Sequence, residues 1–305
     1  MHVYLPIAEL PVNALLMLAL GGVVGFLSGM FGVGGGFLMT PMLIFAGVPS
    51  AVAVATGANP LIASSITGTI AQYRRKNVDI KLGLYLLAGG AAGSLWGVHI
   101  VKLLREAGQF DLVVSLLYVI FMSVVGGLMF VESLGAIRKQ RQGKHTPMRR
   151  KAQRGWIHFL PFRTRFKASK LYISAIPPIG LGVLVGLLSG LMGVGGGFIM
   201  VPILIYVLRV PTSLAIGTSL FQVIFVSAIT TILQAVWNHT VDIALALMLM
   251  AGGVLGAQAG AAAGQRLRAE QLRLLLAILV LGVGLRLLAG LFVPADLFSI
   301  SRAGT

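Results

Sequence analysis

Two glycine-rich stretches carry the residues of this sequence that could bind a ligand. They read Gly32-Val-Gly-Gly-Gly36 followed by Pro41, and Gly193-Val-Gly-Gly-Gly197 followed by Pro202. Over residues 25–48 and 186–209, 14 of 24 positions are identical. Apolar residues replace one another freely in such segments, so this identity requires a local cause. Glycine supplies one, because it permits positive φ and lets another backbone or a ligand approach closely.

A run of three glycines breaks a helix and leaves unpaired backbone N–H groups at the start of the next one. Such a helix start is a ready anion site. The predicted anion-binding glycines are Gly34, Gly35, Gly36, Gly195, Gly196 and Gly197. The alternative is that they only let membrane helices pack closely. The second, matching copy favours binding, and a P-loop is excluded because no Lys-Ser/Thr pair follows.

Polar side chains gather in two segments, at 51–73 and 212–236. Most Ser and Thr residues of membrane helices bond a carbonyl of their own helix, so most of these are expected to be structural. Those expected to line a substrate cavity are Thr56, Asn59, Thr218, Ser219 and Gln222. The Asn59-Pro60 pair also predicts an interruption of its helix.

The charged residues near the apolar segments have simpler interpretations. Asp79 and Asp242 precede apolar segments and are expected to be helix N-caps, with proton transfer as the alternative. No acid lies centrally in a span, so the usual proton or sodium relay is missing, and coupling to either ion stays open. Arg286 is expected to snorkel outward. The sequence has no cysteine and no arrangement of a nucleophile with a base, so we expect neither an enzyme nor a metal or cofactor site.

Composition predicts the elements that position these residues. Hydrophobic residues make up 57% and charged residues 10% of the chain, and the mean hydropathy is +0.94. This is typical of an all-α polytopic membrane protein. About ten apolar segments are expected, at 12–31, 34–48, 51–73, 80–103, 110–131, 173–191, 195–208, 212–236, 243–264 and 272–293. The second and seventh are short and contain Pro, so each either crosses a thin region or forms a re-entrant arm.

Basic residues predict the orientation of the chain. If every segment crosses, 20 of the 24 Lys and Arg residues fall on one side, mostly in the connector and after the third segment. Basic loops stay in the cytoplasm, so both termini are predicted to lie outside a cell membrane. Re-entrant arms would leave this result unchanged.

The two glycine motifs belong to a long internal repeat. The predicted parts are a first transmembrane repeat at 1–131, a basic cytoplasmic connector at 132–172 and a second repeat at 173–305. Each repeat holds an odd number of crossings, so the repeats must have inverted topology, which is typical of secondary transporters. Within the connector, 148–170 mixes basic and aromatic residues. This mix of residues predicts either contact with anionic lipids or a solvated linker between the two repeats. No nucleic-acid-binding module matches the sequence, so we expect no nucleic-acid partner.

The chain resembles the TauE/SafE sulfite exporter family, also called the 4-toluene sulfonate uptake permease-like family. The resemblance covers about 12–130 and 173–290. Besides the two glycine motifs, three other stretches carry the resemblance: Arg74-Arg75-Lys76-Asn77-Val78-Asp79, Ala215-Ile-Gly-Thr-Ser-Leu220 and Asn238-His-Thr-Val-Asp242. Ala55-Thr-Gly-Ala-Asn-Pro60 departs from the matching stretch of the second half, and the connector is long for this family.

The resemblance implies secondary transport of a small anionic substrate such as sulfite, a sulfonate or a related organosulfur anion. The alternatives are an anion channel and a permease for another small organic anion.

Overall fold

The computed structural model describes residues 2–31, 36–141, 163–166, 169, 171–264 and 269–292. Gly34 and Gly35 of the predicted anion site lie outside these residues, as does most of the 148–170 stretch that was expected to meet lipid. The statements below concern the described part of the chain.

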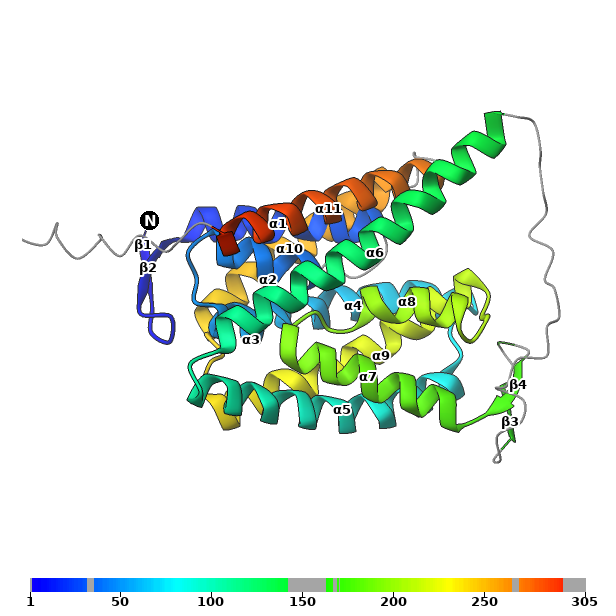
Figure 1. Ribbon diagram of the computed structural model, residues 1–305, viewed down its shortest axis with the longest axis horizontal. Coiled ribbons are helices and arrows are strands. Elements are labelled where there is room, and N and C mark those ends of the chain that lie inside the picture. The colour runs from blue at the N-terminus through cyan, green and yellow to red at the C-terminus, as the bar shows by residue number, and fades with distance from the viewer. Residues whose placement is uncertain are drawn as a thin grey trace, which may run out of the picture.

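The chain folds into helices, with two small hairpins. The helices of the first half are α1 (Ala14–Phe31), α2 (Gly36–Phe45), α3 (Ser50–Gly57), α4 (Asn59–Arg74), α5 (Ile80–Glu106) and α6 (Phe110–Arg141). The helices of the second half are α7 (Ile176–Met192), α8 (Gly197–Tyr206), α9 (Thr212–Leu233), α10 (Ile243–Gly264) and α11 (Ala269–Phe292), with a π-helix at Gln234–Asn238 after α9. Figure 1 shows the long helices lying roughly side by side.

Six of the described helical stretches are long and apolar enough to cross a membrane. They are Ala14–Phe31, Ile80–Glu106, Phe110–Val131, Thr212–Asn238, Ile243–Gly264 and Leu274–Phe292. Three apolar helices are shorter: Gly36–Phe45, Ile176–Met192 and Gly197–Tyr206. The protein is therefore a helical multi-pass membrane protein.

The helix boundaries follow the sequence with one local difference. The expected segment 51–73 is divided between α3 and α4, as the Asn59-Pro60 pair predicted, and Pro60 stands in the first turn of α4, where proline is tolerated. Helix α6 runs to Arg141, beyond the apolar stretch that was expected to end at 131, because the residues that follow are good helix formers.

Two short antiparallel hairpins were not expected from the sequence, but the chain is otherwise helical, which agrees with the predicted all-α class of membrane protein. Strands β1 (His2–Leu5) and β2 (Leu10–Asn13) precede α1, and β3 (Arg163–Phe166) and β4 (Leu171–Ser174) precede α7. The two hairpins lie at opposite ends of the helix bundle (Figure 1). Leu5, Ala8 and Val12 of the first hairpin are buried, so it packs as part of the protein core.

Glycine lets two matching helix pairs approach closely. Helix α1 packs on α10, and α7 packs on α5. A Cβ on Gly21, Gly25 or Gly29 of α1 would overlap the backbone of α10, and the same holds for Gly182 and Gly186 of α7 against α5. These glycines recur every four residues, which is how small residues bring membrane helices together.

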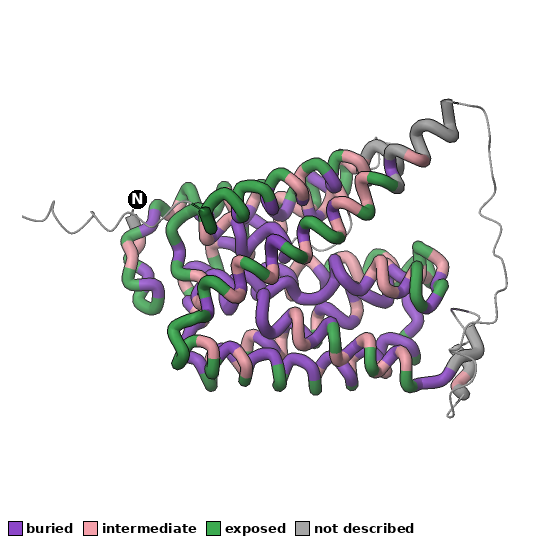
Figure 2. Tube along the Cα trace, viewed as in Figure 1, coloured by how far each residue is buried: buried purple, intermediate pink, exposed green. Residues whose placement is uncertain are grey.

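The two short helices begin in the centre of the protein. Phe37 of α2 and Phe198 of α8 stack with ring centroids 4.0 Å apart and planes 19° apart. Figure 2 shows the buried residues concentrated in the middle of the bundle, with exposed residues along its outer helices. The starts of α2 and α8 are thus shielded from the surroundings by the long helices.

Candidate functional site

The second glycine motif forms a tight, buried turn between α7 and α8. Gly193, Gly195 and Gly196 have φ of +69°, +68° and +78°, a region that other residues rarely adopt. The first bond of α8 runs from Met200 N–H to Gly196 O at 2.9 Å. The amides of Gly197 and the two residues after it therefore have no acceptor inside the helix, which makes this end electropositive.

The first motif meets the second at the start of α2. A Cβ on Gly36 would lie 2.6 Å from Val194 O and would overlap the side chain of Leu61. A Cβ on Gly195 would lie 2.5 Å from Leu61 Cδ1. The two helix starts are therefore neighbours, and the Leu61 side chain touches both. The structure brings together four of the six predicted glycines: Gly36, Gly195, Gly196 and Gly197.

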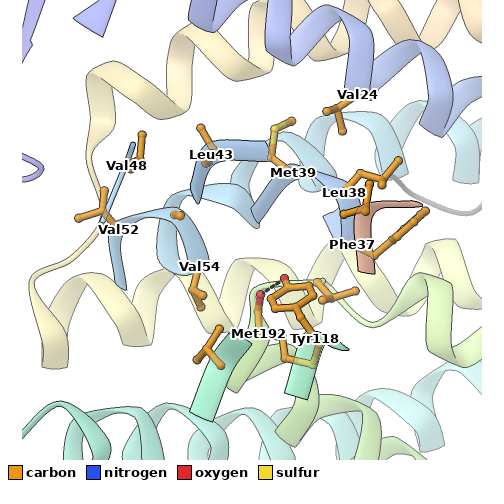
Figure 3. Packing of buried hydrophobic residues seen from close by; sticks show 14 of the residues in the cluster. Val24, Phe37, Leu38, Met39, Leu43, Val48, Val52, Val54, Tyr118 and Met192 are labelled. Carbon is orange, nitrogen blue, oxygen red and sulfur yellow. Dashed lines mark hydrogen bonds between the residues drawn. The ribbon is translucent and has the colours of Figure 1, made fainter. Parts of the chain in front are cut away.

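The first half of the chain also holds the second glycine turn in place. Figure 3 shows the Tyr118 hydroxyl of α6 donating to the carbonyl of Met192, the last residue of α7. Thr40 Oγ1 of α2 donates to the same oxygen at 3.3 Å. A helix leaves its last carbonyls unpaired, so these two contacts satisfy the end of α7.

Thr56 and Thr218 have matching roles that differ from the expected lining of a cavity. Asp242 N–H donates to Thr56 Oγ1 at 3.2 Å, and Asp79 N–H donates to Thr218 Oγ1 at 3.1 Å. Each threonine is fully buried and ties its own half of the chain to the other.

The two aspartates are N-caps, as expected. Asp79 Oδ1 accepts from Leu82 N–H, and Asp242 Oδ1 accepts from Leu245 N–H, both at 3.1 Å. Their second oxygens accept from the hairpins. Asp79 Oδ2 binds Ser169, with its N–H at 2.9 Å and its hydroxyl at 2.7 Å, and Asp242 Oδ2 binds Ile7 N–H at 3.2 Å. Each hairpin is thus fastened to a helix start.

Asn59, Ser219 and Gln222 are buried, as expected of residues that face the interior. Ser219 Oγ donates to Ile216 O of its own helix at 2.9 Å. Gln222 Nε2 donates to Leu86 O at 3.4 Å, whereas Gln222 Oε1 and Asn59 Nδ2 have no hydrogen-bond partner. A buried polar atom without a partner is costly, so these two atoms are available to a ligand.

A cavity of about 630 Å³ lies between α1, α4, α9 and α10. Its polar lining residues are Ser28, Ser64, Thr67, Gln72, Arg75 and Gln258. Thr67, Arg75 and Gln258 are exposed, so the cavity opens to the surface near the C-terminal end of α4. A volume of this size exceeds what a small anion needs.

The cavity narrows toward the helix starts. A void of about 10 Å³ shares Ser28 and Ser64 with the cavity and continues to Met39, Pro60 and Leu61. Leu61 is the residue that touches both glycine turns. The cavity therefore leads from the surface near Arg75 toward the starts of α2 and α8.

The residues of the second half that correspond to the cavity lining are packed inside the protein, so the second half is closed at this place. Ser189 and Gly190 of α7 correspond to Ser28 and Gly29 in the repeat, and both are buried. Gln234 corresponds to Gln72; it is 1% exposed, and its Nε2 donates to Gly190 O at 3.1 Å.

A further hydrogen bond lies at the same end of the protein. Thr230 Oγ1 of α9 donates to Ser94 Oγ of α5 at 3.3 Å. The Ser94 hydroxyl itself donates to Gly90 O of its own helix at 2.8 Å, and Gly186 O of α7 is farther away, at 3.4 Å. Helices α5 and α9 are thereby joined where the first half has an open cavity.

The lining of this cavity differs from the set of polar residues that the sequence selected. Those residues do not lie on its wall, and their role in binding a substrate stays a prediction: Thr56, Asn59, Thr218, Ser219 and Gln222. The wall instead carries Ser64 and Gln72, which stand on the open face of α4. The signal was present in the match between Gln72 and Gln234, which keeps a polar residue at the same place in both repeats.

A multi-pass helical bundle with a cavity that leads from one surface toward buried helix starts is the arrangement expected of a membrane transporter. The sulfite exporter TauE/SafE family matches residues 17–287, and the chain belongs to that family. Its members are membrane transporters and not enzymes.

Individual relatives agree with this assignment. The chain is 27% identical to "Probable membrane transporter protein YunE" of Bacillus subtilis over 282 residues, covering 90% of this chain and 96% of the relative. It is 31% identical to a "Probable membrane transporter protein" of Xylella fastidiosa, covering 82% and 85%. It is also 31% identical to "Sulfite exporter TauE/SafE family protein 3" of Arabidopsis thaliana, over 39% of this chain and 26% of that protein. No solved structure matches the chain.

Proposed function

We propose that this transporter carries small sulfur-containing anions, such as sulfite and sulfonates, by alternating access between two inverted repeats. The name of the family and of its Arabidopsis thaliana member supports the substrate class. The lining of the cavity agrees with an anion, because it contains hydroxyls, amides and one guanidinium and no carboxylate among its described residues.

Matching contacts support the inverted repeats. Each half places its first helix on a glycine-rich helix of the other half, α1 on α10 and α7 on α5. Thr56 and Thr218 bond the opposite half at equivalent aspartates. A hairpin also precedes the first helix of each half, and the two hairpins lie at opposite ends of the bundle, as inversion requires (Figure 1). The π-helix accounts for one extra residue between Gln234 and Asp242 relative to Gln72 and Asp79.

The observation that carries the proposal is the difference between the two ends of the protein. Gln72 lines a cavity of about 630 Å³, and its Oε1 accepts from Asn77 Nδ2 at 3.1 Å. The corresponding Gln234 is buried, and it also donates from Nε2 to Gly190 O of α7. A carrier must open to one side at a time, and two inverted repeats in unequal conformations achieve this. The structure is then one of two states, the one that is open near Arg75.

The anion site of this proposal lies at the starts of α2 and α8. Helix starts provide N–H donors and about half a positive elementary charge each. In the proposal, six glycines form these helix starts: Gly34, Gly35, Gly36, Gly195, Gly196 and Gly197. Asn59 and Gln222, whose side chains carry unpaired amide atoms, add further polar groups to the site. Three nearby hydroxyls would position the backbone around the site and would not bind the anion, because they already form hydrogen bonds with backbone groups: those of Thr56, Thr218 and Ser219.

We further propose that the open end faces the cytoplasm of a cell and that both termini lie outside. Arg74, Arg75 and Lys76 stand at the end of α4 beside the cavity mouth, and the basic connector follows α6. Such clusters remain on the cytoplasmic side during insertion. Within the connector, residues 148–170 would contact anionic lipids there.

Flux measurements on reconstituted protein test this function. Proteoliposomes are loaded with sulfite, methanesulfonate, sulfate or chloride, with and without a proton or sodium gradient. We expect saturable uptake of sulfite or methanesulfonate, and acceleration by unlabelled substrate on the opposite side. Flux without saturation or counterflow would indicate a channel, and transport of none of the sulfur anions would contradict the proposed substrate class.

A further inference from the structure

We propose that the Leu61 side chain occupies an anion-binding pocket whose ligands include the Ser227 hydroxyl and the starts of α2 and α8. Leu61 therefore occludes the site in this state, and an anion binds when Leu61 moves aside. This inference rests on the proposed function, because it specifies how the substrate is bound at that site.

Leu61 packs against both helix starts. Its side chain is 3% exposed and lies against the Cα atoms of both Gly36 and Gly195, where a Cβ on either glycine would collide with it. It also forms part of the lining of the void that joins the main cavity. The Leu61 side chain thus stands between the cavity and the two helix starts.

Ser227 supplies an independent observation. The residue is fully buried in α9, and its Oγ has no hydrogen-bond partner. The oxygen lies 2.7 Å from the position of a Cβ on Gly195, so it faces the turn before α8. An unpartnered buried hydroxyl costs free energy unless a ligand completes it. An anion beside Gly195 would accept this hydrogen bond.

Electrostatics favours the same place. The side chains that meet Gly36, Gly195 and Gly196 are those of Leu61, Ser227, Val185 and Val223, and none of them carries a negative charge. Two electropositive helix ends therefore converge on an apolar side chain, where the Val194 carbonyl beside Gly36 supplies a partial negative charge and no carboxylate lies among these neighbours. Replacing that side chain with an oxyanion would satisfy both ends, as helix starts commonly do for sulfate and phosphate.

Binding of methanesulfonate to purified protein tests the inference. Leu61→Ala removes the side chain that competes for the pocket, so we expect at least tenfold tighter binding. Ser227→Ala removes one hydrogen bond to a charged group, so we expect about tenfold weaker binding. Ser133→Ala is the matched control, because Ser133 is equally buried and unpartnered but lies on α6. It should bind as the wild type does.

A second measurement keeps the inference testable if Leu61→Ala folds poorly. Leu61→Val shortens the side chain while keeping it apolar, and Ser227→Cys in this cysteine-free chain reports access to the pocket. We expect Ser227→Cys to react with a small thiol reagent at least tenfold faster in the Leu61→Val background, and methanesulfonate should slow the reaction.

The outcomes separate this inference from the proposed function. Unchanged affinity in both Leu61→Ala and Ser227→Ala, with normal transport of sulfur anions by the wild type, would overturn the pocket alone. Absence of any sulfur-anion transport by the wild type would overturn the function.

Discussion

Gln234 fastens the closed end of the protein, and removing its carboxamide should open that end. The side chain makes two buried hydrogen bonds, from Nε2 to Gly190 O at 3.1 Å and from Asn238 Nδ2 to Oε1 at 2.6 Å. Gln234→Met keeps the approximate length of the side chain but removes both bonds. In the closed state, the Gly190 carbonyl and the Asn238 amide then remain buried without partners.

The expected size of the effect follows from these contacts. A net hydrogen bond contributes about 1 kcal/mol, and a buried group without a partner costs about 1–3 kcal/mol. Both groups regain water when the end opens, so the penalty applies to the closed state only. A shift of about 2 kcal/mol changes the ratio of the two states by about thirtyfold.

Thiol labelling measures this ratio directly because the chain contains no cysteine. Ser189→Cys reports the closed end, since Ser189 is fully buried, and Ser64→Cys reports the open cavity that Ser64 lines. We expect Gln234→Met to raise the labelling rate of Ser189→Cys about thirtyfold. The matched change Gln72→Met should leave Ser189→Cys protected, because Gln72 stands at the end that is already open.

One result would refute the reasoning about the two ends. If Ser189→Cys stays protected in Gln234→Met while the protein remains folded, the Gln234 bond does not hold that end closed. A thirtyfold rise in both Gln234→Met and Gln72→Met would also contradict it, because the two residues should act in opposite directions.

Three other predictions concern the fold and the topology. Gly193→Ala should prevent stable folding, because the φ of this residue is +69° and a Cβ would overlap Val54 O. Gly47→Ala is the control, because Gly47 has φ +85° but lies in open space. It should lower the free energy of unfolding by about 1 kcal/mol, measured by thermal unfolding. A stable Gly193→Ala protein would show that the turn can rearrange. Thr56→Val and Thr218→Val should each destabilise by about 1–3 kcal/mol, and very unequal values would contradict their matched roles. Reporters fused at position 145 and at the C-terminus should score inside and outside; the same side for both would contradict the inverted repeats.

Local patterns were sufficient to predict the helical class of the protein and two helix N-caps. Apolar runs and prolines located α2 and the break between α3 and α4, and the aspartates before α5 and α10 were recognisable as N-caps. Each of these features depends on residues close together in the sequence. The same holds for the glycines of α1 and α7, whose spacing of four predicts close packing.

Features that depend on distant partners were not predictable in this way. Thr56 bonds a residue 186 positions away, and Thr218 bonds one 139 positions away, so no local pattern distinguishes them from threonines that line a cavity. The hairpins were missed because their strands are four residues long and gain stability by packing and by binding Asp79 and Asp242. An isolated short hairpin is marginal in water.

The difference between the two ends has a cause in the sequence itself. The closed end is held by Gln234, which bonds Gly190 O, and by the bond from Thr230 Oγ1 to Ser94 Oγ. At the equivalent positions of the open end, Ala257 replaces Ser94 and Gly68 replaces Thr230. When that end closes, only the Gln72 bond of this set can form there. The missing bond between these two positions corresponds to about 1 kcal/mol, and in the proposed alternating-access cycle this difference would favour the state that is open near Arg75 while leaving the other state accessible.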